Sequence, residues 1–368
     1  MRICIVTPSL SGGGAEKVAV NLANHYAESG KDTTLLVFIN KGPYKSHLSD
    51  KVKVVDLSVT RSRYAIFKLR SALLKIDPTH VVSVIRDASI VLGLVGKKGE
   101  NTVFAYREAN TLHGMHRLTT LKKWVYRALL KEAYKKADVV IANSEDTKED
   151  LVKNHIIDGE SIKVIRNPVI PEDLSLKLAE EADHPWMKSD EKVVLNVGRL
   201  DPQKNQKLLI DAFFKVVEKK PGTKLLILGE GEQEKPLRQQ IKRLKLNHCV
   251  DLVPFQQNPF PYYQESDLFV LTSDWEGFGN ILVEALACGT PIVSTDCPGG
   301  PRSILADGKY GTLVSVDDAE ELADAIIGQL ENSDRWDRDE LVRRGLEYTV
   351  GAVAEEYLNC IKVAKTSR

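Results

Sequence analysis

Short, mostly apolar runs alternate along this chain with longer segments of helical periodicity. The runs at 3–7, 194–197, 224–228 and 268–271 have the length and composition of strands that are buried on both faces. Between such runs, apolar residues recur at spacings of three and four, as they do over 18–26. This alternation predicts an α/β fold in which helices cover parallel sheets.

The pattern divides into two sets of elements. The 368 residues, 43% of them hydrophobic, are enough for two separate cores. A proline-bearing stretch at 164–173 follows one complete α/β set and precedes the next, as expected at a domain boundary. We therefore predict one domain at 1–168, a second at 169–345, and a C-terminal helix at 346–368.

Charge is distributed unevenly between these halves, although the net charge is zero. Residues 1–168 hold 27 basic and 17 acidic residues, and the remainder holds 24 and 34. The first half is therefore expected to meet an anionic partner. Nucleic acid is not expected, because no recognised reader motif accompanies the basic residues. The five cysteines are scattered without zinc-ligand spacing, which favours a reduced, cytoplasmic protein with no metal site.

Many of these basic residues lie in one amphipathic segment at 117–136. Two interpretations remain open for it. Leu121 and Trp124, with the apolar residues that follow them, can face the core while the basic residues face water. Alternatively, the segment can lie on an anionic membrane surface. The residues expected at such a surface are Lys122, Lys123, Trp124 and Arg127.

The most informative stretch runs from Leu268 to Pro291. It predicts a strand, a glycine-broken acidic loop and a helix that begins with Asn280 as N-cap and ends before Gly289. The free amides of such a helix start suit a phosphate, whereas Glu276 and Glu284 suit hydroxyl groups of a ribose and a sugar. This combination indicates a nucleotide sugar.

A glycine loop follows the first predicted strand and has a rival interpretation. Gly12, Gly13 and Gly14 let backbone approach a ligand closely. A dinucleotide fingerprint is disfavoured, because Lys17 stands at its third glycine position and the second strand ends in Asn40 without an acid to hold a ribose.

Together these segments resemble the signature of retaining glycosyltransferases of family 4, which have the GT-B fold. The resemblance covers nearly the whole chain and implies two Rossmann-like domains facing across a cleft, with the C-terminal helix crossing back to the first domain. It implies catalytic roles for Arg199, Lys204 and Glu276, the two cations holding the diphosphate. The expected donor site comprises Gly13, Gly14, Gly198, Arg199, Lys204, Gly231, Pro254, Phe255, Glu276, Gly277, Phe278, Gly279, Asn280 and Glu284.

Two positions depart from the family pattern. Ala109 stands where the family places a histidine that contacts the transferred sugar, and Ser303 stands where many relatives have a glutamate. His113 and His116 follow Ala109, but loop histidines are more often solvated. The acceptor residues expected beside this position are Arg107, Glu108 and Asn110.

The resemblance implies transfer of a hexose or N-acetylhexosamine from a nucleoside diphosphate, with UDP as the expected one, to a hydroxyl of a glycan or lipid-linked saccharide. It requires no cofactor and no metal, and it suits a cytoplasmic protein that can meet the membrane peripherally. An epimerase or phosphorylase of the same fold, and a non-catalytic nucleotide-sugar-binding protein, remain open. Acceptor-dependent release of UDP would separate a transferase from these alternatives.

Overall fold

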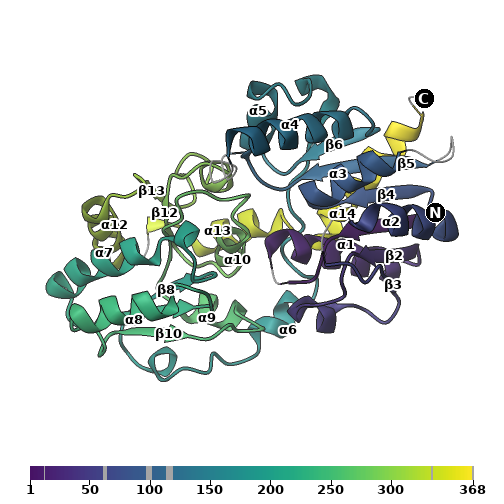
Figure 1. The fold of residues 1–368 in the computed structure, drawn as a ribbon. Coiled ribbons are helices and arrows are strands. Elements are labelled where there is room, and N and C mark those ends of the chain that lie inside the picture. Colours follow the sequence, from purple (N-terminus) through teal and green to yellow (C-terminus); the bar gives the residue numbers. More distant parts are fainter. Residues whose placement is uncertain (12, 61–63, 97–101, 113–118, 333–334, 367–368) are drawn as a thin grey trace. The chain divides into compact units, whose positions relative to one another are not determined.

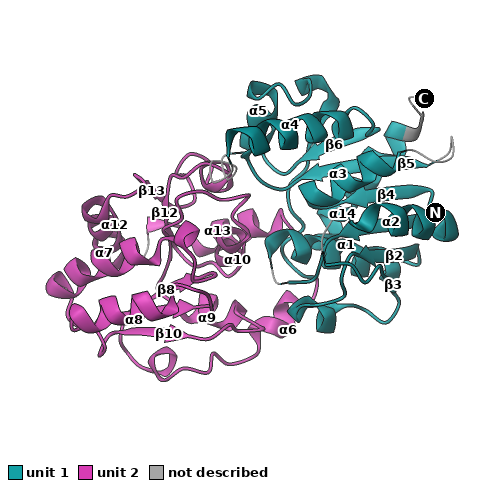
Figure 2. Ribbon diagram, in the orientation of Figure 1, with its two compact units in different colours: residues 1–171, 349–368 teal, residues 172–348 magenta. Residues whose placement is uncertain are grey.

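The computed structural model describes residues 1–368 except 12, 61–63, 97–101, 113–118, 333–334 and 367–368 (Figure 1). The chain forms two compact units, one of residues 1–171 with 349–368 and one of residues 172–348 (Figure 2). It therefore passes twice between the units, once after Pro171 and once after Tyr348.

Unit 1 is built on a seven-stranded parallel sheet with strand order β3-β2-β1-β4-β5-β6-β7. The strands are β1 Arg2–Thr7, β2 Asp32–Val37, β3 Lys53–Asp56, β4 His80–Ser83, β5 Val103–Glu108, β6 Val139–Ala142 and β7 Ile162–Val164. The helices are α1 Gly14–Glu28, η1 Pro43–His47, α2 Ala65–Ile76, α3 Arg86–Val95, α4 Thr120–Tyr134, α5 Glu145–Lys153, η4 Gly159–Ser161 and α14 Val350–Thr366.

Helices cover both faces of this sheet, because successive residues of a strand point to opposite sides. In β1, Ile3 and Ile5 pack on one side with residues of α1 and α14. Cys4 and Val6 pack on the other side with residues of α2, α3 and α4. The C-terminal helix α14 belongs to this unit by contact, and the Tyr26 hydroxyl of α1 donates to its Ala354 carbonyl at 2.8 Å.

Unit 2 has a six-stranded parallel sheet with strand order β10-β9-β8-β11-β12-β13. The strands are β8 Val193–Val197, β9 Lys224–Leu228, β10 Val250–Val253, β11 Leu268–Leu271, β12 Ile292–Thr295 and β13 Thr312–Val314. The helices are α6 Leu174–Leu178, η5 Pro185–Lys188, η6 Pro202–Lys204, α7 Gln206–Lys219, α8 Glu234–Arg243, α9 Phe260–Glu265, α10 Asn280–Ala287, α11 Pro301–Ile304, α12 Ala319–Glu331 and α13 Arg338–Leu346.

The core of unit 2 joins its sheet to α7, α8 and α12 on one face, while α10 packs against α9 and α13. The predicted alternation of strands and helices is confirmed in both units. In each sheet the strand order reverses beside the first strand, between β1 and β4 in unit 1 and between β8 and β11 in unit 2. Ligands of open α/β sheets bind outside the carboxyl ends of the strands at such a reversal.

Candidate active site

The reversal in unit 2 brings the loops after β8 and β11 together, and a charged cluster lies between them. The Lys204 ammonium lies 2.6 Å from Glu276 Oε1, and the Ser273 hydroxyl donates to the same oxygen at 2.6 Å. Only 15% of the Lys204 side chain and 7% of the Glu276 side chain are exposed. Water screens such a pair less than a surface pair, so the attraction between the two charges is stronger than it would be at the surface.

Further hydrogen bonds join the backbones of the same two loops. The Asp274 amide donates to the Gln203 carbonyl at 2.9 Å, and the Gln203 side chain donates to the Trp275 carbonyl at 2.7 Å. The Thr272 hydroxyl donates to the Lys204 carbonyl at 2.9 Å. The cluster therefore rests on loops that are bonded along their length, which limits the movement of its side chains.

A glycine turn after β12 packs against the acidic loop that follows β11. Gly299 and Gly300 have φ values of 104° and 126°, and a Cβ atom on either would collide with the Glu276 or Phe278 carbonyl oxygen. The Glu276 amide also donates to the Pro298 carbonyl at 2.8 Å. Only glycine allows this approach, so the turn fixes the backbone on both sides of Gly277.

Helix α10 begins one residue earlier than predicted. Asn280 is its first helical residue, and Gly279, at φ 100°, is the N-cap. The expectation of Asn280 as N-cap is wrong because the chain needs a left-handed residue there, which glycine adopts without strain. The predicted end is confirmed, since α10 stops at Ala287 and Gly289 follows at φ 71°. None of the described residues in its first turn is acidic.

Glu284 lies inside α10, one turn from its start, and is 4% exposed. Its Oε2 atom accepts a hydrogen bond from the Tyr263 hydroxyl at 3.1 Å. Burial, and next the charge of Glu284, raise the pKa of the Tyr263 phenol well above its usual range, so the phenol stays protonated and acts as the donor.

Arg199 lies on the same loop as Lys204, and each cation is paired with a different carboxylate. The Arg199 guanidinium is 3.1 Å from Asp201 Oδ2, and 69% of its side chain is exposed. Gly198 faces the aliphatic part of Lys204, and a Cβ atom on Gly231 would collide with the Leu200 carbonyl. Gly231 thus allows the loops after β8 and β9 to pack closely.

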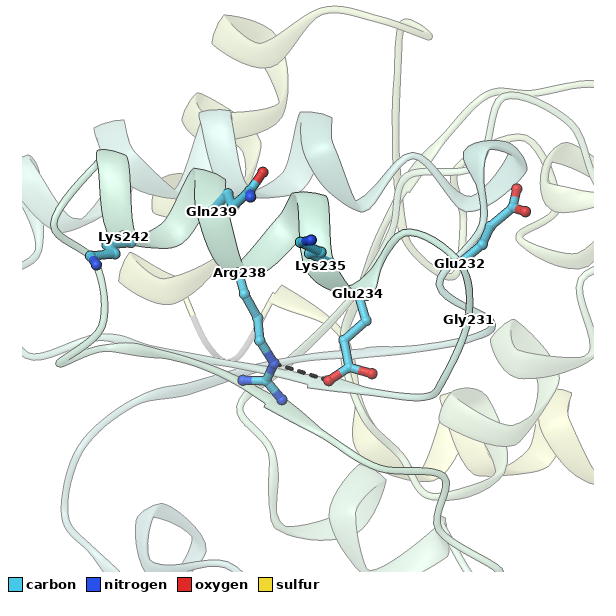
Figure 3. A pocket seen from close by; sticks show the side chains of 7 residues that line it. All are labelled: Gly231, Glu232, Glu234, Lys235, Arg238, Gln239 and Lys242. Atoms are coloured by element: carbon cyan, nitrogen blue, oxygen red, sulfur yellow. Dashed lines mark hydrogen bonds and ion pairs between the residues drawn. The ribbon is translucent and has the colours of Figure 1, made fainter.

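Pro254 and Phe255 follow β10 and are both exposed, Phe255 to 48%. A hollow of about 520 Å³ lies along α8. Figure 3 shows its lining, which consists of Gly231, Glu232, Glu234, Lys235, Arg238, Gln239 and Lys242. Within it, Arg238 Nε donates to Glu234 Oε1 at 3.0 Å. The lining does not include Lys204, Glu276 or Glu284, so this hollow is separate from the charged cluster.

In unit 1, Gly13 is the N-cap of α1 and Gly14 is its first residue. The first turn carries Glu16, and a Cβ atom on Gly13 would collide with the Glu16 carboxylate. The Ser11 hydroxyl donates to Glu16 Oε1 at 3.4 Å. This helix start therefore carries its own anion.

The two charged residues expected to bind an acceptor are internal to unit 1, each being 1% exposed. Arg107 donates to the Val84 carbonyl at 2.8 Å and to Asn167 Oδ1 at 2.6 Å. Glu108 Oε2 accepts from Arg86 Nε at 2.7 Å and from the Tyr134 hydroxyl at 2.9 Å. Both side chains thus hold parts of the unit in place and are not presented to solvent.

The Glu108 carboxylate also organises the segment where the family histidine is missing. Its Oε1 atom accepts from the amides of Ala109 and Asn110 at 3.0 and 3.2 Å. The Arg86 guanidinium donates to the Asn110 carbonyl at 2.7 Å. Asn110 itself is exposed. His113 and His116 lie outside the described residues.

Helix α4 turns only some of its apolar residues to the core. Leu121 and Trp124 are 72% and 70% exposed, whereas Leu130 and Tyr134 are buried. The remaining exposed large apolar residues of α4 are Val125 and Leu129. Lys122 is exposed and Lys123 is half-buried. Arg127 is directed to α5, since its NH2 group donates to Asn154 Oδ1 at 2.7 Å.

Among the residues that the structure describes, no group of three or more histidine, cysteine or acidic side chains is placed to hold a metal ion. No described helix is both long and apolar enough to cross a bilayer.

Sequence reasoning missed the hydrogen-bond partners of the acidic groups. Ser273 lies three residues before Glu276, and this spacing was the only signal available for it. Tyr263, Arg86 and Tyr134 each reach their carboxylate from a different helix, 21 to 26 residues away in sequence. Distant pairings of this kind leave no local pattern.

Comparison with known proteins covers both units. The family model "Glycosyltransferase Family 4" matches residues 12–173, and "Glycosyl transferases group 1" matches residues 180–345. The chain is 32% identical, over 69% of its length and 71% of the relative's, to an N-acetylgalactosamine-N,N'-diacetylbacillosaminyl-diphospho-undecaprenol 4-alpha-N-acetylgalactosaminyltransferase of Campylobacter jejuni. It is 28% identical to the lipopolysaccharide core biosynthesis glycosyltransferase LpsE of Rhizobium meliloti, over 94% and 93% of the two chains.

Solved structures agree on the fold. The crystal structure of HepE of Anabaena in complex with UDP-glucose superposes with a TM-score of 0.80 at 23% identity, covering 99% of this chain and 100% of that one. WaaG, a glycosyltransferase involved in lipopolysaccharide biosynthesis, superposes with a TM-score of 0.76 at 16% identity, covering 98% and 99%. The chain is therefore a glycosyltransferase of the GT-B fold and belongs to family 4, the glycosyl transferases group 1.

Proposed function

We propose that this enzyme transfers a hexose or N-acetylhexosamine from a UDP-sugar to a hydroxyl of a glycan or lipid-linked saccharide, with retention at the anomeric carbon. The observation that carries the proposal is the Lys204–Glu276 pair at the strand-order reversal of unit 2, in which Glu276 lies on the loop that leads into α10. A cation there suits the diphosphate, and a carboxylate with helix amides suits the hydroxyls of the sugar.

Each of these groups is assigned to one part of the UDP-sugar. An ammonium has three N–H donors, so Lys204 can bind a diphosphate oxygen while it also bonds Glu276. Glu276 and the amides of Gly277 to Asn280 hold the sugar hydroxyls, and Glu284 accepts from the ribose. Arg199, exposed on the same loop, adds its charge at the diphosphate. We place the backbone of Pro254 and Phe255 at the base and the loops of Gly198 and Gly231 near the phosphates.

The proposed reaction needs no side-chain nucleophile. The bond from the anomeric carbon to the leaving phosphate oxygen breaks, and the acceptor oxygen forms its bond on the same face of the sugar. The proton of the acceptor hydroxyl passes to an oxygen of the departing diphosphate. Negative charge grows on that diphosphate as the bond breaks, and Lys204 and Arg199 stabilise it more strongly there than in the bound substrate.

We place the acceptor in unit 1 and, where it is lipid-linked, at the cytoplasmic face of a membrane. The names of two similar proteins, the Campylobacter undecaprenol-linked transferase and LpsE, point to acceptors of this kind. Helix α4 supports contact with anionic lipid, because Leu121 and Trp124 are exposed on it beside Lys122. Apolar side chains with basic neighbours are the features of an interfacial helix.

The test is a screen of nucleotide sugars against saccharide and lipid-linked acceptors. Release of UDP should depend on the acceptor, and NMR of the product should show the anomeric configuration of the donor. An inverted product would exclude retention. UDP-sugar turnover that ignores every acceptor, or a change of the sugar without transfer, would favour a hydrolase or an epimerase instead.

A further inference from the structure

A buried phenol from a neighbouring helix bonds Glu284. Tyr263, on α9, is fully buried, and its hydroxyl donates to Glu284 Oε2 at 3.1 Å. The carboxylate belongs to α10, which begins at the proposed donor site. Tyr263, a side chain outside that site, therefore restrains the orientation of the Glu284 carboxylate.

The phenol itself has little freedom to move. The Tyr263 ring packs on the Phe269 ring of β11, with centroids 5.3 Å apart. The Tyr263 carbonyl accepts from the Thr290 hydroxyl at 2.6 Å, just beyond the end of α10. Both the ring and the backbone of Tyr263 are thus tied to the elements that carry the acidic loop.

Protonation gives the hydrogen bond a single direction. Burial raises the pKa of the Tyr263 phenol, so its hydroxyl remains a donor at neutral pH. A carboxylate has about four lone-pair positions, and the phenol occupies one of them. The phenol therefore orients Glu284 and takes only one of these positions itself.

We infer that Tyr263 is a positioning residue for nucleotide recognition, which holds the Glu284 carboxylate in the orientation that accepts hydrogen bonds from the ribose diol. The inference rests on the proposed role of Glu284. A merely structural role is the alternative, in which the bond only fastens α9 to α10. The two roles predict different effects on affinity. Loss of positioning should weaken only ligands that have ribose hydroxyls, whereas a structural loss should weaken ligands with and without them.

The experiment compares UDP with 2′,3′-dideoxy-UDP by calorimetry in the parent enzyme, Tyr263→Phe and Tyr262→Phe. Tyr262 is the matched control, since it is buried in the same helix and adjacent residues of a helix face different directions. We expect Tyr263→Phe to weaken UDP roughly tenfold, the loss of one hydrogen bond to a charged group. Its affinity for the dideoxy nucleotide should stay within about twofold of the parent. Tyr262→Phe should change neither.

The outcomes separate this inference from the proposed function. If the parent prefers UDP and Tyr263→Phe keeps that preference in full, the inference fails while the role of Glu284 stands. If Tyr263→Phe weakens both nucleotides equally, the role is structural and the inference is overturned. If the parent binds both equally, the ribose assignment of Glu284 fails and the inference fails with it.

A double-mutant cycle adds an independent readout. If Tyr263 acts through the carboxylate, adding Tyr263→Phe to Glu284→Gln should produce no further loss of UDP affinity. A full second loss of roughly tenfold would show that the phenol acts on the nucleotide by another route. Thermal unfolding of all four proteins, measured without ligand, identifies any loss that comes from a damaged fold.

Discussion

The two units have the same architecture. In each, a glycine loop leads into a helix beside the strand-order reversal, but the two helix starts differ in charge. In unit 2, the loop before α10 carries Glu276, which is paired with Lys204, and none of the described first-turn residues of α10 is acidic. In unit 1, the first turn of α1 carries Glu16, whose carboxylate lies against Gly13. A glycine loop before a helix therefore does not by itself identify an anion site. The neighbouring charges decide whether a phosphate is favoured.

The units also differ in where their charged residues lie. At the end of β5 in unit 1, Arg107 and Glu108 are internal and bonded to the protein itself. The exposed apolar side chains of unit 1 include Leu121 and Trp124 on α4. In unit 2, the polar groups near the reversal are held side by side on bonded loops. One unit thus offers a fixed polar site and the other an exposed apolar surface.

The strongest test of this contrast is Lys204→Met. We expect kcat/KM to fall by about 10²- to 10³-fold, because the charge that stabilises the leaving diphosphate is lost. The free energy of unfolding should also fall, by about 3 kcal/mol, since Glu276 is left buried without its partner. Steady-state kinetics and chemical denaturation measure the two effects.

A second variant separates catalysis from stability at this pair. Lys204→Met combined with Glu276→Gln removes both charges, so the unfolding free energy should recover while activity stays low. Recovery of activity in the double variant would show that the pair serves only the fold. Unit 2 would then offer no better case for a donor site than unit 1.

The next largest effect is expected at Glu284. Replacement by alanine should weaken UDP by about 1.5 to 3 kcal/mol, because two ribose hydroxyls lose a charged acceptor. Affinity for inorganic diphosphate, which has no ribose, should not change. Calorimetry with both ligands makes the comparison, and unchanged UDP affinity would remove Glu284 from the donor site.

The surface of unit 1 is tested by changing Leu121 and Trp124 together to serine. Burial of large apolar side chains contributes about 1.5 to 3 kcal/mol each, so binding to anionic vesicles should fall more than tenfold. The matched control is Leu176→Ser in unit 2, because Leu176 is also 72% exposed. Sedimentation with vesicles at low salt provides the measurement. Vesicle binding that depends equally on Leu176 would erase the proposed difference between the units.

Arg199→Gln should have a smaller effect than Lys204→Met. Its guanidinium is mostly exposed and already paired with Asp201, so water screens its charge. We expect kcat to fall about tenfold or less, with a modest rise in KM. A change confined to the donor KM would assign Arg199 to uniform binding, without a part in the transition state.

The periodicity of the sequence predicted the parallel α/β sets, and glycine chemistry predicted the end of α10 at Gly289. Both depend on residues close in sequence. The burial of Glu108 was not predictable in this way, because its partners Arg86 and Tyr134 come from other helices. The exposure of Trp124 was also open, since an amphipathic pattern shows two faces without saying which one meets the core.

The smallest expected effect concerns Glu16, and it tests the opening contrast directly. Glu16→Gln removes the anion at the start of α1, so the unfolding free energy should fall by about 0.3 to 1 kcal/mol. UDP affinity should change less than about twofold, because the carboxylate serves its own helix. The mirror variant Asn280→Asp adds an anion at the first residue of α10, where it should weaken UDP by like-charge repulsion. Tighter UDP binding by Glu16→Gln would instead show that the loop of Gly13 and Gly14 meets the donor phosphates and that Glu16 opposes them.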